Sequence, residues 1–132
     1  MLCSEVSLVL SSKVPSDPEA IASVVPLRPF SVWRRKPNLV VHGVDTIPAM
    51  SWIYERQAEG DLASQSLTES SLREIASCAH KIREAVSTFG LRGTVICRLA
   101  SADESSCVEI PPDLLSAIAL CGCTLQFAAD RD

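Results

Sequence analysis

The most regular stretch of the chain is LREIASCAHKIREAVSTF, residues 72–89. Its apolar side chains recur at alternating steps of three and four residues, at Leu72, Ile75, Ala79, Ile82, Val86 and Phe89. This spacing lines the apolar groups along one side of an amphipathic helix. We therefore predict one helix from about Glu69 to Thr88, ended by Gly90, which suits the left-handed position after a helix.

On both sides of this helix the sequence changes to the two-residue period of half-buried strands. The alternation predicts strands at 5–11, 39–41, 51–57, 94–100, 106–110 and 123–129. Two shorter helices are expected to begin at Pro18 and Pro112, because proline is favoured in the first turn of a helix. The segment 27–37 contains two prolines and is interpreted as an irregular connection or a short edge strand.

The resulting element order is β-α-β-β-α-β-β-α-β. It predicts a single α+β domain over residues 1–132, with a largely antiparallel sheet and about three helices on one face. The length of 132 residues, the 47% hydrophobic content and the 21% charged content agree with one globular core. The first six elements match a ferredoxin-like arrangement.

The N-terminus lacks the features of a secretory signal, and no uncharged stretch reaches the roughly 20 residues of a membrane-spanning helix. We therefore predict a cytoplasmic protein that does not bind membranes. The net charge of −4 argues against a nucleic-acid partner. The stretch from Arg28 to Lys36 is basic and aromatic and would suit a single-stranded nucleic acid, but we favour packing of Phe30 or Trp33 under a loop.

Six cysteines offer reactive chemistry: Cys3, Cys78, Cys97, Cys107, Cys121 and Cys123. Cytoplasmic thiols stay reduced, and several of these positions are apolar positions of predicted elements, so we expect buried free thiols. A zinc site would combine Cys121 and Cys123 with Cys97, Cys107, His42 or His80. Paired zinc ligands are usually separated by two to four residues rather than one, so we predict neither a metal nor a cofactor.

Carboxylates gather in two places, before the long helix and after the strand that follows it. A general acid/base pair would have to be desolvated, whereas exposed acids would form a negative surface for a basic protein partner. Aromatic side chains often anchor such interfaces. The candidate partner-binding residues are therefore Glu55, Glu59, Asp61, Asp103, Glu104, Trp33 and Tyr54.

Four segments together resemble a bacterial family of domains of unknown function. They are DPEAI (17–21), VVPLRP (24–29), SWIY (51–54) and IPPDLLSAIALCGCTLQF (110–127). The resemblance spans nearly the whole chain, and residues 33–49 fit it less well. Members of the family are proposed to include immunity proteins of polymorphic toxin and contact-dependent inhibition systems. The resemblance implies a toxin-binding protein and supplies no catalytic residue.

The favoured function is therefore that of an immunity protein, which neutralises a cognate basic toxin domain by occluding its active site or substrate surface. We expect it to be a monomer or a weak dimer. We also expect no enzyme activity, because the common nucleotide-binding and hydrolase motifs are absent from the sequence. Two other functions stay open. One is a small enzyme that uses a cysteine or a carboxylate pair, and the other is a ferredoxin-like module for ligand binding or dimerisation.

Overall fold

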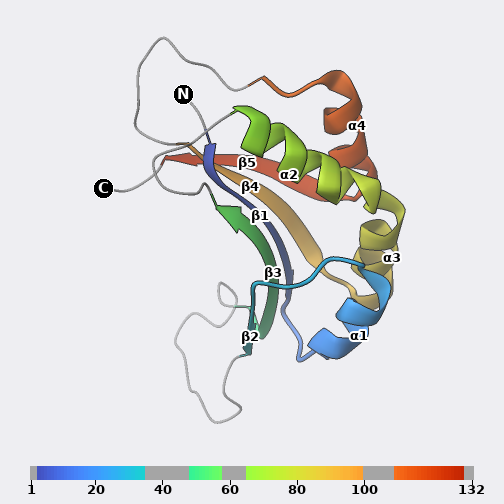
Figure 1. Cartoon of the computed structure of the whole chain (residues 1–132). Helices are drawn as coiled ribbons and strands as arrows, with labels where there is room; N and C mark the ends of the chain where they lie inside the picture. The colour runs from blue at the N-terminus through green and yellow to red at the C-terminus, as the bar shows by residue number, and fades with distance from the viewer. Residues whose placement is uncertain (1–2, 35–47, 58–64, 100–108, 130–132) are drawn as a thin grey trace.

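A five-stranded sheet forms the centre of the computed structural model, which describes residues 3–34, 48–57, 65–99 and 109–129 (Figure 1). Its strands lie in the order β2-β3-β1-β4-β5 and are antiparallel except for the parallel pair β4–β5. Their bounds are β1 (Cys3–Ser12), β2 (Ser31–Arg34), β3 (Met50–Gln57), β4 (Arg92–Leu99) and β5 (Cys123–Ala129). The prediction of an α+β protein with a largely antiparallel sheet is confirmed.

The helices of the described residues all lie on one face of the sheet (Figure 1). They are α1 (Pro18–Val24), α2 (Gln65–Ser77), α3 (Ala79–Phe89) and α4 (Pro112–Leu120). Asp17 caps α1, because its side-chain oxygen accepts the backbone N–H of Glu19 at 3.0 Å. Pro18 and Pro112 open their helices as predicted.

The chain interleaves two βαβ units. α1 connects β1 to β2, and both strands run antiparallel to β3, which lies between β2 and β1. α2 and α3 connect β3 to β4, and β1 lies between those two strands. This is the split βαβ arrangement of ferredoxin-like domains. α4 then returns the chain so that β5 can pair in parallel with β4.

Two details of the predicted element order are wrong. The strand expected at 106–110 does not pair with β4, because β1 and β5 occupy the two sides of β4. Glu109 and Ile110 lie outside any strand, while 106–108 and the strand expected at 39–41 lie outside the described residues. Of the two interpretations given for the proline-containing segment 27–37, the short edge strand is confirmed, because β2 forms there at the edge of the sheet.

The second error concerns the long helix, which is two helices separated at Cys78. The Ser77 hydroxyl donates to the backbone oxygen of Glu74 at 2.6 Å, and the backbone N–H of Cys78 bonds to Ile75, three residues earlier, at 3.2 Å. Side chains that bond to helix carbonyls compete with the regular backbone pattern and bend helices. Ile75 and Ile82 are nevertheless both fully buried, so the apolar stripe continues across the break.

The core lies between the helices and one face of the sheet. Alternate residues of β1, β3 and β4 point toward the helices. The fully buried members are Val6, Leu8, Leu10, Met50, Trp52, Val95 and Cys97. Leu72, Ile75 and Ile82 pack against them from α2 and α3. The side chains between these core positions point to the other face of the sheet.

Replacing Gly90 with alanine is expected to lower the free energy of unfolding by about 1 kcal/mol. Gly90 ends α3 with φ 61°, and a Cβ there would meet no atom within 4 Å, so the loss comes from backbone strain alone. Urea unfolding followed by circular dichroism measures it. Gly90→Asn is the matched control and should lose less, because asparagine tolerates the left-handed conformation. Equal losses in the two variants would contradict this account.

Candidate functional site

The sheet face opposite the helices is the candidate site, and we call it the open face. It consists of Glu5, Ser7, Val9 and Ser11 of β1, Ser31 and Trp33 of β2, Ser51, Ile53, Glu55 and Gln57 of β3, Arg92, Thr94, Ile96 and Arg98 of β4, and Thr124, Gln126 and Ala128 of β5. Among the described residues no helix covers this face (Figure 1). An antiparallel sheet commonly leaves one face to solvent, but such a face is then usually polar throughout.

The middle of the open face is apolar. Val9, Ile53 and Ile96 are half-buried neighbours on three adjacent strands. Beside them, on the edge strand β2, the side chain of Trp33 is 42% exposed and lies opposite Ser51. A tryptophan beside branched aliphatic side chains offers a partner a large apolar contact area.

Two carboxyl groups meet at one end of the open face. Glu5 on β1 and Glu55 on β3 lie on neighbouring strands, close enough for Glu5 to raise the pKa of Glu55. Ser7 Oγ donates to Glu5 Oε1 at 3.0 Å, and Gln57 Nε2 donates to Glu55 Oε2 at 3.2 Å. Arg98 Nε on β4 lies 3.6 Å from Glu5 Oε1. One guanidinium therefore faces two carboxyl groups.

This arrangement raises the pKa of Glu55 to about 7. The largest cause is the hydrogen bond to Glu5, which needs a proton between the two carboxyl groups. Partial burial and the negative charge of Glu5 act in the same direction, whereas Gln57 and Arg98 oppose it. Near neutral pH, Glu55 can therefore release or take up a proton, and a cation placed beside the pair would displace that proton.

The carboxyl pair predicts a pH dependence of stability that Glu55→Gln should remove. Because the pKa is raised in the folded state, folding takes up a proton, and this stabilising contribution is lost as the pH rises through about 7. The side chain is partly exposed, so we expect a loss of about 1 kcal/mol from this group rather than the full value of the shift. The glutamine amide replaces the donated proton, so this variant should lose less stability between pH 5.5 and 8.5.

Urea unfolding at the two pH values checks this prediction. Glu84→Gln is the matched control, because Glu84 is an exposed acid of α3 that pairs with Lys81 at 3.7 Å, away from the open face. The control should keep the wild-type pH dependence. If Glu55→Gln keeps it as well, the two carboxyl groups do not share a proton.

The structure separates the two predicted aromatic anchors. Trp33 lies on the open face, whereas Tyr54 lies on the helix-covered face and is 5% exposed. Burial, followed by the nearby Glu74, raises the pKa of the Tyr54 hydroxyl. Tyr54 is therefore a core residue in this structure, and a partner on the open face does not reach it. Of the predicted acids, Glu55 lies on the open face, and Glu59, Asp61, Asp103 and Glu104 lie outside the described residues.

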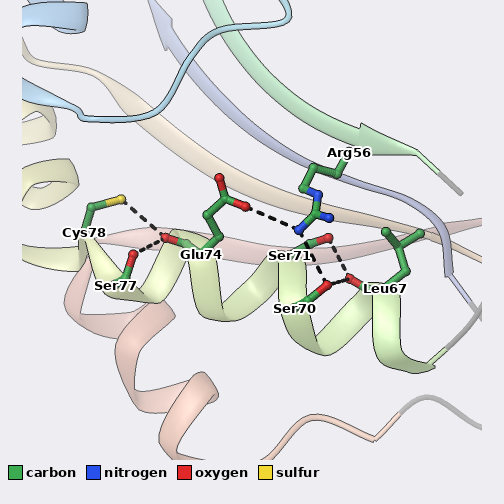
Figure 2. A network of polar contacts seen from close by, with 7 residues as sticks. All are labelled: Arg56, Leu67, Ser70, Ser71, Glu74, Ser77 and Cys78. Carbon is green, nitrogen blue, oxygen red and sulfur yellow. Dashed lines mark hydrogen bonds and ion pairs between the residues drawn. The ribbon is translucent and has the colours of Figure 1, made fainter.

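A polar network joins β3 to α2 at the rim of the helix-covered face (Figure 2). One guanidinium nitrogen of Arg56 donates to Glu74 at 3.3 Å and to the hydroxyl of Ser70 at 3.5 Å. Ser70 and Ser71 donate in turn to the backbone oxygen of Leu67, at 3.2 and 2.6 Å. These contacts hold α2 over the sheet, so we interpret the network as structural.

The basic aromatic segment is more exposed than predicted. Phe30 is 66% and Trp33 42% exposed, so neither packs under a loop. Arg34 pairs with Asp17 at 3.5 Å, which offsets part of the positive charge. Arg35 and Lys36 lie outside the described residues. The observed cations therefore do not form a phosphate-binding stripe beside Trp33.

The predicted burial of cysteines is confirmed at Cys78, Cys97 and Cys121, and Cys123 is half-buried. None of these four forms a disulfide within the part of the chain that the structure describes. In the part of the chain that the structure describes, no three side chains of the metal-binding types lie together as a metal site. His42 and Cys107, two of the other candidate ligands of the zinc site that the sequence argues against, lie outside that part.

Glu5 is a site residue that the sequence pattern alone does not reveal. Its alternation with Val6 placed it on the polar side of the first strand, but its partner Glu55 is fifty residues away along the chain. Only the pairing register of β1 with β3 brings the two together.

Comparisons of the chain with protein-family models, curated proteins and solved structures give no match. Within the described residues, no helix has both the length and the apolar character needed to cross a membrane.

Proposed function

We propose that this protein is an immunity protein that neutralises a cognate bacterial toxin domain by covering its active site or substrate surface with the open face. The observation that carries the proposal is the Glu5–Glu55 pair on the open face, which no helix of the described residues covers and which also presents Trp33. The family resemblance of the sequence points to the same class of protein.

Charge is the first argument for this use of the open face. Where Glu5 and Glu55 meet on the open face, Arg98 can neutralise one of the two carboxyl groups, and a shared proton neutralises the other. A lysine or arginine of a basic partner would replace that proton and gain a charge-assisted hydrogen bond. The proposed binding therefore releases a proton near neutral pH and becomes tighter as the pH rises.

Shape and composition are the second argument. Interfaces tend to have an apolar centre and a polar rim, and their energetic anchors are often tryptophan, tyrosine or arginine. Val9, Ile53 and Trp33 supply an apolar centre, and Glu55 and Arg98 lie at its rim. A rigid sheet also holds these groups in place before binding, which lowers the entropy cost of association.

Co-expression with the product of the adjacent reading frame tests the proposal. We expect the neighbour to stop bacterial growth when expressed alone, and the two products to copurify and restore growth when expressed together. The Glu55→Gln variant should restore growth less well, whereas Glu84→Gln should act like the wild type. A harmless neighbour, or a neighbour that neither binds this protein nor is neutralised by it, would refute the immunity function.

A further inference from the structure

Two of the free cysteines lie at the junction of α4 and β5 with one residue between them. Cys121 follows α4 as its C-cap and is fully buried, and Cys123 is the first residue of β5 and is half-buried. Gly122 between them has φ 77°, a left-handed turn that glycine adopts without strain. Cys121 is therefore a core residue, whereas Cys123 is partly exposed, although only one residue separates them in the chain.

The two thiols lie close enough to shift each other's pKa. Cys123 Sγ donates to the backbone oxygen of Cys121 at 3.9 Å, and a hydrogen bond joins the two thiol groups. That bond lowers the pKa of Cys123 and raises the pKa of Cys121. The Cys121 thiol therefore holds the proton, and Cys123 is the member of the pair that becomes a thiolate more readily.

Gly93 on the neighbouring strand makes room for the Cys123 sulfur. Gly93 pairs with Cys123 in the parallel ladder of β4 and β5. A Cβ at Gly93 would lie 2.5 Å from Cys123 Sγ, closer than real atoms approach. The Cys123 sulfur thus occupies the space that a side chain of residue 93 would fill.

We propose that Cys121 and Cys123 form a redox-active dithiol that reacts with low-molecular-weight disulfides and closes to an intramolecular disulfide. In the first step the Cys123 thiolate attacks one sulfur of the small disulfide, a mixed disulfide forms, and one small thiolate leaves. In the second step the Cys121 sulfur attacks Cys123, the new S–S bond forms, and the second small thiol leaves with the proton of Cys121. The small disulfide is reduced to two thiols as the protein dithiol is oxidised.

The chain geometry permits this bond. Two Cα atoms that are two residues apart lie at most about 7.6 Å apart, and a turn between them shortens this toward the 4.4–6.8 Å range typical of disulfides. A ring closed over one intervening residue is strained, and strained disulfides are easily reduced again. We therefore expect reversible closure.

In the test, the folded protein is treated with oxidised glutathione and the reaction is stopped with acid. The protein is then denatured, its remaining thiols are alkylated, and it is digested with a protease that cuts before aspartate. The fragment from Asp113 to Ala129 then contains Cys121 and Cys123 and no other cysteine. We expect this fragment to lose two hydrogen atoms and to escape alkylation, and to become alkylatable again after treatment with dithiothreitol. Cys97, which is fully buried in the core, should remain alkylated throughout as the internal control.

Two variants separate the roles of the thiols. Cys121→Ser should stop at a stable glutathione adduct on Cys123, and Cys123→Ser should leave Cys121 unmodified because its thiol is buried. Circular dichroism establishes that both variants are folded. The proposal is overturned if the wild-type fragment stays fully alkylated, if it retains glutathione without closing, or if Cys121 pairs with Cys78 instead.

Discussion

Replacing Trp33 with alanine is expected to weaken binding to the proposed toxin partner by about 30-fold or more, with little change in stability. A buried interface tryptophan commonly contributes 2 kcal/mol or more to binding, which corresponds to this factor. Trp33 is 42% exposed on the edge strand β2, so its removal opens no cavity in the core. Isothermal titration calorimetry with the purified partner measures the affinity, and urea unfolding measures the stability.

Leu115→Ala is the matched control for this prediction. Leu115 is 45% exposed on α4, so the two variants remove comparably exposed apolar groups from opposite sides of the molecule. The control should bind like the wild type. If Leu115→Ala weakens binding and Trp33→Ala does not, the partner binds the helical side and the open face is not the interface.

The residues of β3 show why the candidate partner-binding residues could be predicted only in part. The two-residue period of a strand at 51–57 implies that Trp52, Tyr54 and Arg56 share one side and that Glu55 lies on the other, and the register of β3 agrees with this. Periodicity does not show which side the helices cover, because that depends on the crossovers between strands. Tyr54 was therefore a reasonable candidate in the sequence, and it is a core residue in the structure.

The long helix predicted from the sequence was also correct only in part. The stripe from Leu72 to Phe89 predicted the buried face correctly, since Leu72, Ile75 and Ile82 are fully buried. The break at Cys78 leaves that stripe in phase, so no apolar pattern reveals it. Its cause is hydrogen bonding of serine and cysteine groups to nearby carbonyls. These residues form such bonds in some helices and point to solvent in others.

The prediction of a wrong neighbour for β4 has a topological cause. Thr94–Leu99 alternates as expected and forms a strand, but a local pattern does not identify the strand's neighbours. β1 and β5 fill both sides of β4, and β5 arrives through α4 from further along the chain. The Glu5–Glu55 pair depends on the same kind of distant pairing, which is why the site residue Glu5 was missed.

The largest stability effect is expected at Trp52, where alanine should lower the free energy of unfolding by about 3–5 kcal/mol. Trp52 is fully buried on β3, opposite Leu10 of β1 and Val32 of β2. Its removal leaves a cavity under the helices that the surrounding sheet cannot close. Urea unfolding monitored by circular dichroism gives the value, and a loss below about 1.5 kcal/mol would show that the site collapses around the smaller side chain.

Phenylalanine at the same position should cost far less, for a reason specific to this tryptophan. The indole N–H of Trp52 is buried and has no hydrogen-bond partner among the residues that the structure describes. An unsatisfied buried donor costs about 1–3 kcal/mol, so Trp52→Phe removes that penalty while it loses part of the ring volume. The two effects oppose each other, and we expect a net change within about 1 kcal/mol of the wild type. A loss as large as that of alanine would mean that the indole N–H is satisfied in solution, and a buried water beside it would be the direct explanation.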